Sequence, residues 1–142
     1  MVKIALLKQD FYDDYSHCPE ILHKEKRPHI IVQIDIDGVL YGIPLRSNIK
    51  HPYVIWTDRP NFSGLDLSKT IVITDSDKYI DASKKPYINK HEFDVILETG
   101  TIIKLELSKY IKKYKNAKTK QHIKQNKQLC EYSTLQYFEQ YI

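Results

Sequence analysis

Apolar and polar residues alternate along much of the first half of the chain, which is the pattern of half-buried strands. The pattern predicts strands at residues 2–8, 29–37, 39–47, 52–58 and 68–75, with a turn-rich loop at 59–66. Asp37-Gly38 separates two of these runs and is a strong signal for a two-residue hairpin turn. Gly42 and Pro44 interrupt the second strand of this hairpin, so we expect a bulge or an edge position there.

After residue 88 the spacing of apolar residues changes from two to about 3.6, the period of a helix. Asn89 is a candidate N-cap and Gly100 a candidate helix stop. The apolar positions of the next helix are Leu107, Tyr110, Ile111 and Tyr114. The last turns are expected to bury Leu129, Tyr137, Phe138 and Tyr141. Strands followed by helices predict an α+β fold with an antiparallel sheet and a helical C-terminal half.

The composition is that of one ordinary globular domain spanning residues 1–142. Hydrophobic residues make up 42% of the chain and charged residues 28%, which argues against disorder. Cys18 and Cys130 lie far apart and form no CxxC pattern, so we expect neither a zinc site nor a disulfide framework. No run of apolar residues is long enough to cross a bilayer. We therefore expect a soluble, cytoplasmic protein that does not bind a membrane.

Positive charge is concentrated in one segment of the chain. Residues 101–130 contain nine lysines and one acid, a net charge of +8, whereas the remaining 13 basic and 17 acidic residues give −4. A basic segment on a mildly acidic body suggests a polyanionic partner such as RNA, although lysine-rich helices are also common as solvated faces. The candidate RNA-binding residues in this segment are Lys104, Lys109, Lys112, Lys113, Lys115 and Lys118.

A second concentration of polar residues follows the predicted hairpin, in the sequence RSNIKH at 46–51. No glycine-rich phosphate loop and no HExxH sequence occurs, and the acid pairs are explained by turns, so a nuclease with two metal ions is disfavoured. RNA carries its own nucleophile, the 2′-hydroxyl. Its cleavage requires a proton acceptor, a proton donor and cations that hold the phosphate. The residues of this segment are also ordinary turn residues, so a plain loop is the alternative.

The candidate catalytic residues of this segment are Arg46, Ser47, Lys50 and His51. Lys50 would clamp the phosphate or donate a proton, Ser47 would bind the 2′-hydroxyl or a phosphate oxygen, and Arg46 would supply a fork of donors. His51 is a candidate acid–base group. Further candidate RNA-binding residues are Arg27, His29 and Asn48.

The order of these segments resembles the ribonuclease toxins of type III toxin–antitoxin systems, the ToxN/AbiQ group, and among them the TenpN branch. The resemblance covers most of the chain. It is carried by KRPHIIVQIDIDGVLYGIPLRSNIKHPY at 26–53, GLDLSKTIVI at 64–73 and KYIKKYKNAK at 109–118. Its most specific part is the strand–turn–strand core that ends in PLxS and is followed shortly by lysine.

The resemblance implies a compact, strongly twisted antiparallel sheet, a partial barrel with helices packed around it. It also implies a sequence-selective, metal-independent endoribonuclease without a cofactor, which leaves 2′,3′-cyclic phosphate ends on cellular or phage transcripts. Such toxins trim a small structured repeat RNA, which inhibits them and assembles with them into closed complexes. The family's serine falls on Ser47 and its lysine on Lys50.

This sequence departs from the family pattern at two points. Two residues instead of one separate Ser47 from Lys50, and Arg46 replaces a hydroxyl residue. The family's basic residue before the hairpin falls on Arg27, and its aromatic residue near the first strand on Phe11 or Tyr12. Two other functions stay open: a non-catalytic RNA-binding module that uses the basic helix, and a protein–protein adaptor whose lysines are only solvated.

Overall fold

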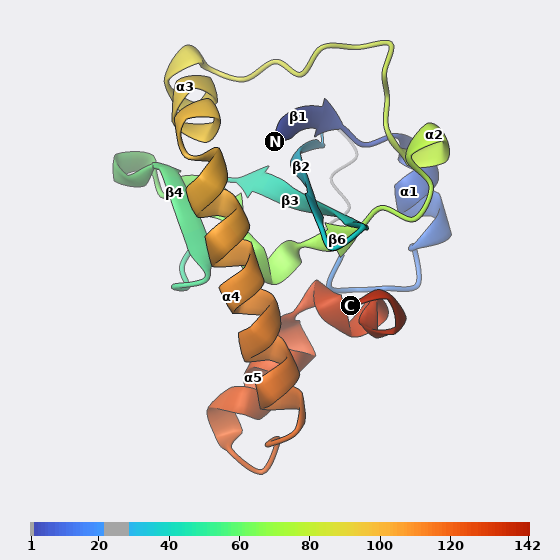
Figure 1. The fold of residues 1–142 in the computed structure, drawn as a ribbon, viewed down its shortest axis with the longest axis vertical. Coiled ribbons are helices and arrows are strands. Elements are labelled where there is room, and N and C mark those ends of the chain that lie inside the picture. The colour runs from blue at the N-terminus through green and yellow to red at the C-terminus, as the bar shows by residue number, and fades with distance from the viewer. Residues whose placement is uncertain (1, 22–28) are drawn as a thin grey trace.

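The computed structural model describes residues 2–21 and 29–142 (Figure 1). Its strands are β1 (Lys3–Leu6), β2 (Ile30–Ile36), β3 (Val39–Arg46), β4 (Val54–Asp58), β5 (Ser63–Asp66) and β6 (Ile71–Val72). Its α-helices are α1 (Gln9–Asp14), α2 (Ser76–Tyr79), α3 (Lys90–Glu98), α4 (Gly100–Lys118) and α5 (Lys124–Tyr132). Short 3₁₀ helices are η1 (Arg59–Asn61), η2 (Leu67–Lys69), η3 (Thr134–Tyr137) and η4 (Glu139–Tyr141). The predicted α+β fold in one domain is confirmed.

The strands form one antiparallel sheet in the order β1-β2-β3-β5-β4, and β6 pairs with β3 beside this path. The predicted hairpin joins β2 to β3, with Ile36 opposite Val39. Its two turn residues, Asp37 and Gly38, both have positive φ, as a type I′ turn requires. The path ends at β1 on one side and β4 on the other, so the sheet is open.

The expectation that β3 lies at an edge is wrong, because β3 is central. It pairs with β2 on one side, and on the other side first with β6, through Gly42, and then with β5, from Leu45 onward. Pro44 lies in the interval between these two partners, where its missing N–H leaves no ladder bond unmade. The irregularity in the sheet occurs between β4 and β5, at Trp56 and Asp58.

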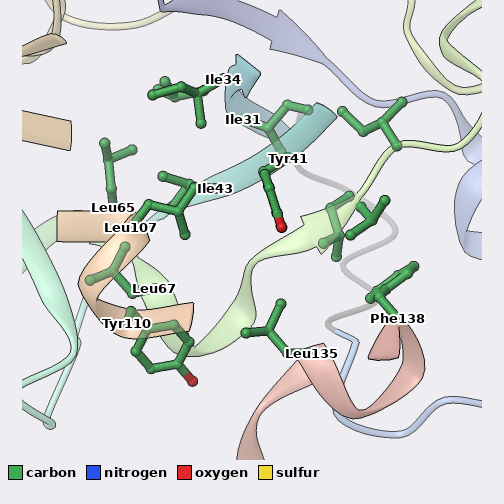
Figure 2. Close-up of a cluster of buried hydrophobic side chains, with 14 of the residues drawn as sticks. Ile31, Ile34, Tyr41, Ile43, Leu65, Leu67, Leu107, Tyr110, Leu135 and Phe138 are labelled. Atoms are coloured by element: carbon green, nitrogen blue, oxygen red, sulfur yellow. The ribbon is translucent and has the colours of Figure 1, made fainter. Parts of the chain in front are cut away.

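Helix α4 crosses one face of the sheet and buries the apolar stripe predicted from its sequence (Figure 1). Figure 2 shows Tyr41 and Ile43 of β3 near Leu107 and Tyr110 of α4, with Leu65 of β5 beside them. All five side chains are at most 3% exposed. Burial of this stripe, rather than helix propensity, therefore fixes α4 on the sheet.

A small cavity lies between α1 and the middle strands of the sheet. Phe11 and Tyr12 of α1 line this cavity of about 30 Å³ together with Ile31 of β2 and Pro44 of β3. This space holds about one water molecule. Pro44 is the last residue of β3 in the lining of this cavity, and the polar corner of the sheet begins with the next polar residue of the strand, Arg46.

Several boundaries differ from the sequence prediction. The predicted loop at 59–66 contains β5, and the predicted strand at 68–75 is reduced to the two residues of β6, preceded by η2. Asn89 caps α3 as expected, accepting a bond from the Glu92 N–H at 2.8 Å. Gly100 begins α4 instead of ending α3 in a left-handed conformation.

The C-terminal core is also smaller than predicted. Leu129 and Phe138 are buried, whereas Tyr137 is half-buried and Tyr141 is exposed. Among the described residues, no helix combines the length and apolarity needed to cross a membrane.

Candidate active site

The end of β3 places Arg46 on the sheet face that α4 does not cover. Arg46 lies opposite Gly64 of β5, and Gly64 in turn lies opposite Trp56 of β4. Residues directly opposite one another in an antiparallel sheet point to the same face, so Arg46 and Trp56 flank a position without a side chain. A Cβ on Gly64 would lie 2.4 Å from the carbonyl oxygen of Ile55, so this position requires glycine.

Asp66, at the end of β5, is the centre of the polar corner, which also contains Arg46, the loop 47–50, His51 and Ser68. Its carboxylate is fully buried and pairs with the Arg46 guanidinium. The other carboxylate oxygen, Oδ1, lies 3.1 Å from His51 Nε2 and accepts bonds from the Ser68 hydroxyl at 2.6 Å and the Ser68 N–H at 3.0 Å. One buried acid therefore holds two of the four predicted catalytic side chains in place.

The electrostatics of this carboxylate favour its charged form. Burial alone would oppose ionisation, but hydrogen bonds from His51 and Ser68 and the charge of Arg46 hold the pKa of Asp66 below its usual value. The charge on Arg46 is thus balanced within the corner. Among described residues, Arg46 Nε is buried without a hydrogen-bond partner, so the ion pair uses only part of the guanidinium.

His51 is fixed at both ring nitrogens. Its Nδ1 accepts a bond from the Tyr53 N–H at 3.1 Å, and its Nε2 lies within 3.2 Å of both Asp66 Oδ1 and the Ser68 hydroxyl. An accepting Nδ1 carries no proton, so we assign the ring proton to Nε2, which donates to Asp66. This arrangement favours a positioning role for His51, and its acid–base role stays a prediction.

Ser47, Asn48 and Lys50 lie in the loop between β3 and β4. Asn48 has a φ of 58°, a left-handed conformation that asparagine tolerates well. Ile49 anchors the loop, because its side chain is buried and its N–H donates to the Phe62 carbonyl at 3.1 Å. Ser47 is half-buried and Lys50 exposed. Neither side chain has a hydrogen-bond or ion-pair partner within residues 2–21 and 29–142.

The corner therefore separates two kinds of side chain. Arg46 and His51 are engaged with Asp66, whereas the Ser47 hydroxyl and the Lys50 amine are available to a ligand. A phosphate at this loop would meet Lys50 as a cation that has no acidic partner among the described residues. Such an arrangement can stabilise added negative charge on a phosphate and offer a hydroxyl contact.

The lysines predicted to bind RNA are exposed on α4 but do not share one direction. Lys113 Nζ lies 5.9 Å from the centre of the Tyr53 ring, beside His51. Lys118, about 140° away around the helix axis, pairs instead with Glu139 at 2.9 Å. The remaining members of this set are Lys104, Lys109, Lys112 and Lys115. Lys113 is thus the member of the set that borders the corner.

His29, another predicted RNA-binding residue, lies at a groove whose lining does not include Asp66. The His29 ring stacks on Tyr12, with ring centres 4.0 Å apart, and the open groove has a volume of about 890 Å³. Lys8, Lys84 and Lys85 line the same groove together with the acids Asp10 and Asp81. Arg27 lies outside the described residues, so its predicted role stays a prediction.

Three residues of the corner were missed from the sequence. Asp66 and Ser68 fall in and after the predicted loop at 59–66, and Lys69 follows them. The DxS spacing, in which Asp66 accepts from the Ser68 N–H, is a recognisable capping signal. Lys69 donates to the Tyr132 carbonyl at 3.1 Å, and burial lowers the pKa of its amine.

Within the described ranges, no three His, Cys, Asp or Glu side chains gather closely enough to hold a metal ion. No family model, no curated protein and no solved structure matches the chain.

Proposed function

We propose that the protein is an endoribonuclease toxin of a type III toxin–antitoxin system, which cuts RNA without a metal ion. The observation that carries this proposal is the corner at the end of β3. There, buried Asp66 fixes Arg46 and His51 beside a loop whose serine and lysine are unpartnered. Rigid strands that present free polar groups on a short loop are a common support for catalysis.

In this proposal the ribose 2′-hydroxyl gives its proton to water and attacks the neighbouring phosphate, and the 5′-oxygen leaves with a new proton, giving a 2′,3′-cyclic phosphate. Lys50 stabilises the phosphorane or protonates the leaving oxygen, because its exposed amine is the free cation of the loop. Ser47 orients the scissile phosphate through its hydroxyl. Arg46, whose charge Asp66 balances, offers the guanidinium N–H groups that its ion pair leaves unused, and His51 is held beside Asp66.

The path of the RNA is proposed from the surrounding cations. Lys113 lies over Tyr53 at the border of the corner, and the groove near His29 carries Lys8, Lys84 and Lys85. Cations placed along a strand bind its phosphates without reading sequence. The substrates would be cellular or phage transcripts in the cytoplasm. The partner would be a small structured repeat RNA that the enzyme trims and that inhibits it in a toxin–RNA assembly.

A second candidate function is a non-catalytic RNA-binding module. The observation that favours it is the engagement of both His51 ring nitrogens, which leaves no imidazole nitrogen free to take a proton. This module would bind RNA with strong salt dependence and would not cut it.

The test is incubation of the purified protein with mixed RNA in excess chelator, followed by mapping of the new ends. The proposal predicts chelator-resistant cleavage with 2′,3′-cyclic phosphate ends, slowed by Lys50→Ala and by Ser47→Ala. Binding without cleavage would favour the module instead. Neither binding nor cleavage would favour an adaptor that recognises protein.

A further inference from the structure

An aromatic cluster lies at the turn between β4 and β5, next to the corner. The Trp56 and Phe62 rings are 6.4 Å apart in a T-shaped arrangement. The Arg59 guanidinium lies over the Trp56 ring, 5.8 Å from its centre. Phe62 is 57% exposed, so much of an apolar ring faces solvent beside the Arg59–Trp56 pair.

The backbone of Phe62 makes this exposure more informative. Phe62 has a φ of 53°, a left-handed conformation that is unfavourable for a bulky residue and that glycine or asparagine adopts readily. The turn would therefore form more easily with another residue, and the exposed ring adds little to the core. Strained, exposed side chains of this kind cluster at functional sites. The geometry of the turn does not explain why position 62 is a phenylalanine. A ligand that binds the exposed ring does.

The cluster is connected to the corner in two ways. The Phe62 carbonyl accepts the Ile49 N–H at 3.1 Å, which ties the turn to the loop that carries Ser47 and Lys50. Trp56 and Arg46 lie on the same face of the sheet, on either side of Gly64. A chain of phosphates held at Lys50 and Arg46 would thus bring its next base to the aromatic cluster.

We propose that Phe62, with Trp56 and Arg59, forms a stacking subsite for one unpaired nucleobase next to the scissile phosphate. This inference rests on the function proposed above and names a subsite of the same active site. The exposed ring would stack on the base, and Arg59 would attract the strand.

The charges around the cluster favour single-stranded RNA over an apolar protein surface. Arg59 and Lys50 are exposed cations, while Asp58 is engaged by the Asn61 amide at 2.7 Å. A base also fits the size of the exposed surface, because one ring offers one stacking face. A duplex hides its bases and would not occupy the subsite.

The test uses Trp56 as an internal probe, because it is the only tryptophan of the chain. The full protein is titrated with a short single-stranded RNA in which every 2′-hydroxyl is methylated, so that cleavage cannot occur. The RNA is expected to change Trp56 fluorescence. Phe62→Asn, which suits the left-handed turn, is expected to weaken binding about five- to hundredfold. Tyr132→Asn removes an exposed aromatic ring at the end of α5 and is expected to leave the Kd within about twofold.

Two results would overturn the subsite: an unchanged Kd for Phe62→Asn, or RNA binding that leaves Trp56 fluorescence unaltered. An RNA series with one abasic position, titrated against the unmodified protein, keeps the inference falsifiable if a variant fails to fold. One abasic position should weaken binding far more than the others, and equal effects at every position would contradict the subsite. If wild type cleaves natural RNA but Phe62→Asn binds RNA as tightly as wild type, the subsite alone is refuted. Stacking without cleavage would refute the proposed nuclease alone.

Discussion

Two regions of the molecule carry positive charge in different ways. On α4, six lysines from Lys104 to Lys118 are exposed, and two of them are paired with acids on the surface. At the end of β3, the Arg46 guanidinium and the His51 imidazole meet on one carboxylate that is fully buried. The first region dominates the net charge, whereas the second has fixed geometry.

The difference shows that the density of charged residues along a sequence does not indicate which side chains the fold holds in a fixed geometry. Surface ion pairs such as Lys109–Glu106 contribute little energy, because water screens them and flexible side chains must be ordered. A buried acid cannot be left unpaired, so its partners are held in one place. Asp66 therefore gives Arg46 and His51 a precision that the α4 lysines lack.

The largest expected effect follows from removing the buried acid. Asp66→Ala leaves Arg46 without its counter-charge and should lower the free energy of unfolding by about 3–5 kcal/mol. Asp94→Ala removes an exposed i,i+4 partner of Lys90 and should cost only about 0–1 kcal/mol. Urea unfolding of both variants measures the contrast. Equal costs would show that Asp66 is no more important to the fold than a surface acid.

The next effect concerns activity. Lys50→Ala should reduce kcat for RNA cleavage about 10²–10³-fold, because the positive charge that this proposal places at the transition state is lost. Lys112→Ala, on the exposed side of α4, should leave kcat unchanged within about twofold. Single-turnover cleavage of one RNA substrate gives both rates. A Lys112→Ala variant that is as slow as Lys50→Ala would move the chemistry from the corner to α4.

The pH dependence of stability sharpens the same contrast. The pKa of Asp66 is depressed in the folded protein, so its contribution is present above the unfolded pKa and is lost as pH falls through the folded pKa. The stability difference between wild type and Asp66→Asn should therefore shrink between about pH 5 and pH 2. Urea titrations across this range measure it. A difference that does not change with pH would mean that Asp66 titrates normally in the folded state.

The smallest effect is expected on α4. Lys104→Ala should weaken RNA binding about uniformly across sequences and reduce the slope of log K against log salt by at most about 1. Lys113→Ala should have the larger effect of the two, because Lys113 borders the corner over Tyr53. Fluorescence binding at several salt concentrations measures both slopes. Identical losses would make α4 one continuous RNA-binding face.

Periodic features of the fold could be predicted from the sequence. The β2–β3 hairpin follows from alternation around Asp37-Gly38, and the buried face of α4 follows from a regular apolar stripe. β5 could not be predicted, because it is four residues long, contains Gly64 and follows a proline turn. The edge prediction for β3 failed because Pro44 falls between two partner strands, which only the tertiary pairing reveals.

The candidate site could be predicted in part for a similar reason. The polar cluster at 46–51 is contiguous, so composition alone marks it. The acid that organises it lies 20 residues beyond Arg46 and is brought to it by the pairing of β3 with β5. A sequence read locally gives Asp66 no such role, because its burial depends on partners distant in the chain.

The most direct test of the central claim is RNA cleavage in excess chelator by wild type, Ser47→Ala and Lys50→Ala, with identification of the new ends. Wild type is expected to leave 2′,3′-cyclic phosphate ends, and both variants are expected to cut more slowly. Cleavage that chelator abolishes, ends with a free 3′-hydroxyl, or variants as fast as wild type would contradict it.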